Sequence, residues 1–174
     1  MDLRWLGLAL AALVVLGLLS VPRGGRPGEG VFPIVGQRAP EFTLSGRGEF
    51  TMSEAPGRPI VIAFWTTWCG VCRHDLVVLE EFHRRYRDWI AVVGVCPERW
   101  PQVPAIVLER GITFPVVHDP GAVVTRRYQL SENLRYPFTV FVDERGRVAG
   151  VWAVAIRDLG HLLELLSQSG ITIP

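Results

Sequence analysis

The sequence contains no lysine, and all 18 of its basic residues are arginine. The 17 acidic residues leave a net charge of +1, so no excess of positive charge is available for a nucleic-acid backbone. DNA- and RNA-recognition motifs are absent as well, and we therefore expect no nucleic-acid partner. Hydrophobic residues make up 49% of the chain, which is typical of a globular protein and argues against disorder.

Cysteine is scarce, and two of the three cysteines, Cys69 and Cys72, form a CxxC pair. Attachment of c-type haem requires histidine after the second cysteine, and Arg73 excludes it. A structural zinc site usually takes four ligands, whereas Cys96 is the one remaining cysteine and the histidines are scattered. We therefore expect no bound metal and no cofactor beyond a redox-active disulfide between Cys69 and Cys72.

The N-terminal run at residues 5–21 contains no charged residue. As a helix it would span about 26 Å, slightly less than the roughly 30 Å hydrocarbon core of a bilayer. Residues 18–22 offer no clean cleavage site, so we expect a single-pass membrane anchor, with a cleaved signal and a buried helix as alternatives. More arginines lie after the run than before it, which favours a cytoplasmic domain. A short apolar N-terminal segment usually directs export of the domain behind it, however, so we expect an extracytoplasmic domain on the periplasmic or cell-surface side.

The chain divides into the membrane segment 1–21, a linker at 22–33 and one domain at 34–174. The linker is rich in glycine, proline and arginine and has no hydrophobic period. Within the domain, periodicity and turn residues predict a β-hairpin around 45–48, a strand at 59–65, a helix after Cys69, a strand at 90–95, a helix at 103–109, an extended piece at 115–117, a helix at 122–128, a hairpin of 138–142 with 148–152, and a helix capped by Asp158. This order predicts an α/β sandwich with a mixed central sheet.

The position of the CxxC pair favours redox chemistry. Cys69 lies between a predicted buried strand and a helix, so unpaired backbone N–H groups and the positive end of the helix dipole would favour its thiolate. Cys72 comes one helical turn later, close enough to attack a mixed disulfide on Cys69. A purely structural disulfide is the alternative, but it would not explain Trp65 and Trp68 beside the pair.

Residues 64–73, FWTTWCGVCR, resemble the active-site signature of the TlpA-like branch of the thioredoxin superfamily. That branch includes ResA-like, cytochrome-maturation and suppressor-of-copper-sensitivity proteins. The similarity extends through residues 36–44, 111–116 and 136–140 and covers about 34–165. It implies a thioredoxin-like domain that is tethered to the membrane and exchanges disulfides with exported, cysteine-containing proteins, often apocytochromes c. The implied electron source is a membrane thiol donor.

By this resemblance Cys69 is the nucleophile and Cys72 is the resolving thiol. Asp75 matches the acidic residue three positions after the second cysteine, which implies proton transfer to or from Cys72. On residue type alone, Asp75 could equally be a solvated carboxylate that the helix dipole stabilises.

Pro137 matches the family's cis-proline, which would hold the Tyr136 backbone near the cysteines as an edge for an extended client chain. Without the resemblance, a proline at the entry of a strand is the alternative. Trp68, Gly70 and Val71 complete the expected client-contact residues. The Gly70-Val71 pair differs from the proline-containing pair of many relatives, which leaves the redox potential open.

Other features depart from the family or lie outside its signature. Ala63 stands where relatives often have Asp or Asn, so a buried proton acceptor is missing there. Val77 replaces a common helix-kinking proline, and we expect a straighter helix. Segment 129–135 is longer than usual, so client contacts cannot be copied across. We interpret Cys96 as a small core residue, with a third redox or metal-binding role as the alternative, and His74 as solvated.

Two other function classes remain as alternatives. The Thr66-x-x-Cys69 pattern imitates the peroxidatic motif of peroxiredoxins, but the proline expected before that threonine is missing, and Cys72 and Pro137 favour disulfide exchange. A copper- or zinc-handling module on the same fold would show additional Met or His near Cys69, where only His74 occurs. The sequence thus predicts a thiol–disulfide oxidoreductase that acts as a protein disulfide reductase.

Overall fold

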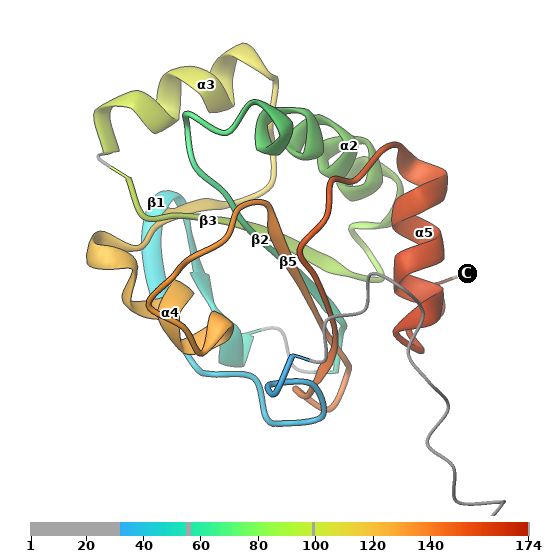
Figure 1. Ribbon diagram of the computed structural model, residues 1–174. Helices are drawn as coiled ribbons and strands as arrows, with labels where there is room; N and C mark the ends of the chain where they lie inside the picture. The colour runs from blue at the N-terminus through green and yellow to red at the C-terminus, as the bar shows by residue number, and fades with distance from the viewer. Residues whose placement is uncertain (1–31, 55–56, 99, 174) are drawn as a thin grey trace, which may run out of the picture. The chain divides into compact units, whose positions relative to one another are not determined.

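The computed structural model describes residues 32–54, 57–98 and 100–173 (Figure 1). The expected membrane segment 1–21 and most of the expected linker lie outside these residues. The compact unit begins at Phe32, whose ring meets Phe138 edge-on with the centroids 5.4 Å apart. Among the helices that the structure describes, none is long and apolar enough to cross a membrane.

One mixed sheet forms the centre of the described domain, with its six strands in the order β1-β4-β3-β2-β5-β6. The strands are β1 (Thr43–Thr51), β2 (Ile60–Phe64), β3 (Ala91–Cys96), β4 (Val116–His118), β5 (Phe138–Val142) and β6 (Val148–Trp152). β2, β3 and β4 run parallel, whereas β1 pairs antiparallel with β4, β5 with β2, and β6 with β5. The mixed sheet predicted from the sequence is confirmed.

Helices cover both faces of this sheet. The α-helices are α2 (Gly70–Tyr86), α3 (Val103–Glu109), α4 (Val123–Gln129) and α5 (Leu159–Gln168), and the short 3₁₀ helices are η1 (Met52–Glu54), η2 (Trp100–Gln102) and η3 (Pro120–Ala122). α2, α3 and α5 lie on one side of the sheet and α4 lies on the other (Figure 1). Side chains from α2, α3 and α5 join one hydrophobic cluster, and side chains from α4 join a second one. This sandwich is the thioredoxin-like α/β fold that the sequence predicted.

β2 is the central strand that leads to the CxxC pair. All five of its residues are buried, because both faces of the strand are covered. Val61 and Ala63 belong to the cluster beneath α2, whereas Ile60, Ile62 and Phe64 belong to the cluster on the α4 side. This double burial explains why the sequence of the strand is a continuous apolar run.

The N-terminal hairpin agrees with the expectation only in part. The structure assigns Thr43–Thr51 to the single strand β1, and Gly46 and Arg47, expected to form the turn, pair with β4. The two ends of the segment do meet, because the Met52 N–H donates a hydrogen bond to the Phe42 carbonyl at 3.1 Å. The expected turn residues pair with the free backbone groups along the edge of β4. This pairing involves a strand far away in the sequence, so local turn propensity could not predict it.

Candidate active site at Cys69 and Cys72

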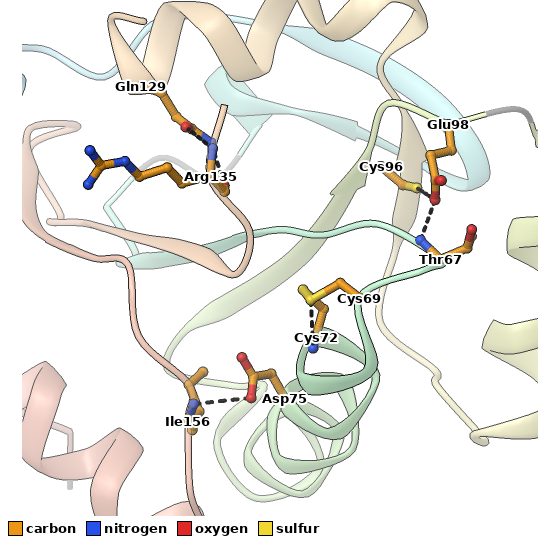
Figure 2. The surroundings of a disulfide bond; sticks show 9 residues. All are labelled: Thr67, Cys69, Cys72, Asp75, Cys96, Glu98, Gln129, Arg135 and Ile156. Atoms are coloured by element: carbon orange, nitrogen blue, oxygen red, sulfur yellow. Dashed lines mark hydrogen bonds between the residues drawn. A yellow bond between two sulfur atoms is a disulfide. The ribbon is translucent and has the colours of Figure 1, made fainter. Parts of the chain in front are cut away.

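Cys69 and Cys72 lie between the end of β2 and the first turn of α2. Cys69 is the N-cap of α2, and its Sγ accepts a hydrogen bond from the Cys72 N–H at 3.1 Å. The two Sγ atoms form a disulfide of 2.06 Å, with the Cα atoms 5.2 Å apart (Figure 2). The free N–H groups at the start of this 17-residue helix would stabilise a thiolate on Cys69 once the disulfide is reduced.

The two cysteines differ in their access to solvent. Cys69 is 8% exposed, whereas Cys72 is 1% exposed. A thiol or disulfide on another molecule therefore reaches the Cys69 sulfur more readily than the Cys72 sulfur. This difference favours Cys69 as the nucleophile and Cys72 as the resolving thiol.

Asp75 lies on α2 one turn beyond Cys72 and is only 4% exposed (Figure 2). Its Oδ1 accepts a hydrogen bond from the Ile156 N–H at 3.1 Å, and its Oδ2 is buried with no hydrogen-bond partner among the described residues. Burial raises the pKa of Asp75 to about 6, although the Ile156 hydrogen bond and the nearby His74 act to lower it. This location rules out the solvated carboxylate, and a carboxyl that titrates near neutral pH can exchange protons during a reaction.

The Tyr136–Pro137 peptide bond is cis, in agreement with the resemblance. β2 and β5 pair antiparallel with Phe64 opposite Phe138, so this bond lies at the same edge of the sheet as the CxxC pair. The Tyr136 ring meets the Trp68 ring edge-on, with the centroids 6.1 Å apart. Tertiary structure thus brings the expected client-contact residues from two distant segments together.

The surface beside Cys69 is apolar and open to solvent. Trp68 is 70% exposed and Val71 is 47% exposed, and Gly70 between the cysteines is exposed as well. Large apolar side chains that remain exposed around a reactive group are typical of a surface that contacts another protein.

Glu98 contributes an acidic group that the sequence did not single out. Its carboxylate accepts a hydrogen bond from the Thr67 N–H, two residues before Cys69, and its Oε2 lies 4.0 Å from the Cys96 Sγ (Figure 2). The parallel pairing of β2 and β3 places the carboxyl ends of both strands at one edge of the sheet. The position of Glu98 shortly after the strand predicted at 90–95 was the signal that could have found it.

The structure also places four other residues that the sequence analysis weighed. Cys96 is fully buried, and burial raises the pKa of its thiol to about 12, so it stays protonated at neutral pH as a core residue does. His74 is exposed, with its Nε2 3.0 Å from the Arg157 carbonyl oxygen. α2 runs through Val77 as one helix, and Ala63 lies buried in β2. The described part of the chain holds no group of three or more potential metal ligands.

Known proteins resemble this chain in sequence and in fold. The model of the AhpC/TSA family matches residues 35–151. The chain is 32% identical over 123 residues to the thioredoxin-like protein YneN of Bacillus subtilis (strain 168), a match that covers 67% of this chain and 69% of YneN. It is 26% identical over 145 residues to the thiol-disulfide oxidoreductase ResA of Oceanobacillus iheyensis, covering 77% of this chain and 74% of ResA.

The solved structures show the same fold. The crystal structure of a DsbF homologue from Corynebacterium diphtheriae has a TM-score of 0.66 and 22% sequence identity, and the match covers 86% of this chain and 99% of that one. The sequence relatives and the fold together confirm the resemblance to the ResA-like proteins of the thioredoxin superfamily.

Proposed function

The chain belongs to the AhpC/TSA family and is a thiol–disulfide oxidoreductase, and we propose that it reduces disulfides in exported client proteins through Cys69 and Cys72. The observation that carries this proposal is the Cys69–Cys72 disulfide at the start of α2, with Cys69 as the N-cap of the helix. A more exposed cysteine and a buried one, a single helical turn apart, supply the attacking and the resolving sulfur that exchange requires.

The proposed cycle begins with reduction of the Cys69–Cys72 disulfide by a membrane thiol donor, which delivers two electrons and is itself oxidised to a disulfide. The Cys69 thiolate then attacks one sulfur of a client disulfide, and the other client sulfur leaves as a thiolate that takes up a proton. Cys72 loses its proton and attacks the Cys69 Sγ, so the mixed disulfide breaks and the second client sulfur leaves. The client has gained two electrons, and the Cys69–Cys72 disulfide is restored.

Asp75 is the proposed proton acceptor for Cys72 in the second attack. Its place on the next turn of α2, its unpartnered Oδ2 and a pKa raised by burial to about 6 support this role. Above that pH the carboxylate is ionised and can accept a proton. Burial also brings the pKa of the carboxyl closer to the pKa of a thiol than the pKa of a solvated carboxyl is.

The client is expected to approach as an extended segment with apolar side chains. Trp68 and Val71 offer exposed apolar surface, and the N–H and C=O of Tyr136, which have no hydrogen-bond partner among the described residues, are free to pair with a client strand. Apocytochromes c are the client class that the resemblance suggests. We infer that residues 5–21 tether the domain to the outer side of the membrane, which would bring it to exported clients and to a membrane donor.

Reduction of insulin by dithiothreitol, with the full-length chain in detergent micelles as catalyst, tests the proposal. The wild type should accelerate the reaction, Cys69→Ser should abolish the acceleration, and Cys96→Ala should retain it as a matched control. Full activity in Cys69→Ser would contradict the proposed nucleophile. If the wild type instead consumes hydrogen peroxide rapidly and leaves insulin unreduced, a peroxiredoxin-like function replaces the one proposed here.

A further inference from the structure

The side chain of Gln129, the last residue of α4, bridges the segment that precedes the cis-proline. The Gln129 Nε2 donates a hydrogen bond to the Arg135 carbonyl at 2.9 Å, and its Oε1 accepts one from the Arg135 N–H at 2.8 Å (Figure 2). One side-chain amide therefore satisfies both backbone groups of Arg135, as a neighbouring strand residue would. In Figure 2 the Arg135 guanidinium points away from the cysteines. Gln129 therefore binds the backbone of Arg135 and not its charged group.

We propose that Gln129 is a positioning residue for disulfide exchange, which fixes the backbone of Tyr136 as the edge to which a client chain binds. This inference rests on the proposed function. Arg135 directly precedes Tyr136 and the cis bond to Pro137, so the two hydrogen bonds from Gln129 act one residue away from that edge.

The hydrogen bonds around the cis peptide give the reason. Gln129 occupies both the N–H and the C=O of Arg135. The described residues supply no hydrogen bond to the backbone N–H or C=O of Tyr136. The N–H and C=O of Tyr136 are therefore free to pair with a client, whereas the N–H and C=O of Arg135 are hydrogen-bonded to Gln129.

α4 gives Gln129 a rigid base. Asp119 is 1% exposed, and its carboxylate accepts hydrogen bonds from the Val124 N–H at 3.0 Å and the Thr125 N–H at 2.8 Å near the start of the helix. Further along α4, the fully buried Tyr128 donates its hydroxyl hydrogen to the Pro40 carbonyl at 2.8 Å. Because α4 is fixed by these contacts, Gln129 can hold the segment in place before a client binds. Less conformational entropy is then lost on binding, and the affinity for the client is higher.

A second contact between α4 and the segment is weaker. The Arg126 Nε lies 2.7 Å from the Glu132 Oε2, but the two side chains are 40% and 84% exposed. Exposed ion pairs of this kind contribute little because solvent screens them. The two Gln129 hydrogen bonds are solvent-exposed as well, but they hold the backbone of the residue next to Tyr136, so Gln129 is the contact that the proposal assigns to positioning.

The test compares Gln129→Ala with Gln168→Ala, in full-length chain in detergent micelles. Gln168 is a matched control because it is the last residue of α5 and its Nε2 also donates a hydrogen bond within the chain, at 3.0 Å to the Glu164 Oε1. Two rates are measured: reduction of insulin by the enzyme, with KM and kcat separated, and direct reduction of the Cys69–Cys72 disulfide by dithiothreitol. The small dithiol needs no strand-like pairing, so its rate reports the redox pair alone.

Gln129→Ala should raise the KM for insulin about fivefold to tenfold, the scale of one or two hydrogen bonds, with little change in kcat. Its dithiothreitol rate should stay within about twofold of wild type, and Gln168→Ala should match wild type in both assays. Gln129→Glu keeps the acceptor and loses the donor, so an intermediate KM is expected.

Three results would overturn the inference: an unchanged KM in Gln129→Ala, a loss that is equal for insulin and dithiothreitol, or an equal effect in Gln168→Ala. A wild type that does not reduce insulin at all would instead contradict the proposed function, so the two failures are distinguishable.

Discussion

Asp75 Oδ1 accepts a hydrogen bond from the Ile156 N–H at 3.1 Å, which joins the second turn of α2 to the loop that leads into α5. The loop buries the carboxyl, and burial raises its pKa from 3.8 to about 6. The folded state therefore binds the Asp75 proton more tightly than the unfolded chain does, and stability falls as the pH rises from the unfolded to the folded pKa.

Asp75→Asn should remove this loss of stability. Below about pH 4 both proteins carry a neutral side chain at position 75, whereas above about pH 6 only the wild type must hold a buried charge. We reference each free energy of unfolding to the value of the same protein at low pH. On this scale the variant should be more stable than wild type by up to about 3 kcal/mol near pH 8. Urea unfolding of the oxidised proteins at a series of pH values measures it, and two parallel stability curves would contradict the raised pKa.

The same substitution should slow disulfide exchange. Asparagine cannot accept the Cys72 proton, so the wild-type rate should rise through about pH 6 and the rate of Asp75→Asn should lack that rise. Insulin reduction as a function of pH provides the comparison. If rate and pH profile both match wild type, Asp75 is a buried structural carboxyl without a part in proton transfer.

Cys72→Ala should trap the client of this protein. Without the resolving thiol, the mixed disulfide between Cys69 and a client has no internal sulfur to break it. Purification from the native host, nonreducing separation and mass spectrometry should recover an exported cysteine-containing protein linked through Cys69. An apocytochrome c would support a maturation role, and a membrane protein with paired cysteines would identify the electron donor. The Cys69→Ser/Cys72→Ala double variant is the control, and equal capture by both would contradict the mechanism.

Glu80 should stabilise the fold through three hydrogen bonds. Its buried carboxylate accepts from the Thr113 N–H and Oγ1, both at 2.7 Å, and from the Arg84 Nε at 2.6 Å. Burial alone would raise the pKa of Glu80, but these bonds lower it below its usual value. Glu80→Gln should reduce the free energy of unfolding at neutral pH by about 1.5–3 kcal/mol, the scale of hydrogen bonds to a charged group.

Folding lowers the pKa of Glu80. The contribution of Glu80 to the free energy of unfolding is therefore present above the pKa of the unfolded state and is lost as the pH falls through the pKa of the folded state. The difference between wild type and Glu80→Gln should therefore shrink below about pH 4.5. Glu81→Gln is the matched control, because Glu81 forms a solvent-exposed ion pair with Arg85. This substitution should lower the free energy of unfolding by at most about 0.5 kcal/mol. Equal losses in the two variants would contradict the role of the Thr113 contacts.

The segment at residues 5–21 should anchor the chain in a membrane. An uncharged apolar run of this length partitions into hydrocarbon as a helix. Full-length protein should remain with membranes after carbonate washing, and protease added to intact spheroplasts should digest the domain. Release by carbonate would contradict the anchor, and a protected domain would reverse the proposed orientation.

Much of the fold could be predicted because its signals are local. The apolar run before Trp65 is a buried strand, Asp158 caps α5 through the His161 N–H, and α3 occupies the residues expected. The CxxC pair could be placed at a strand-to-helix junction for the same reason, since a cap and a helical period involve neighbours within one turn.

Other parts of the site depend on segments far apart in the chain. The sequence left Asp75 undecided between a solvated and a functional carboxyl, and the loop at Ile156 decided it. Glu98 meets Thr67 only because β2 and β3 are neighbours, and the expected turn at Gly46 became part of a strand at the edge of β4.

The sequence by itself determined the redox pair, its place at the start of a helix and most of the strands and helices. Tertiary structure alone decided that the Asp75 carboxyl is buried and that the backbone of Arg135 pairs with the Gln129 side chain. The physical reason is the range of the interactions. Periodicity and capping act between residues a few positions apart, whereas desolvation and strand pairing depend on whatever the rest of the fold brings into contact.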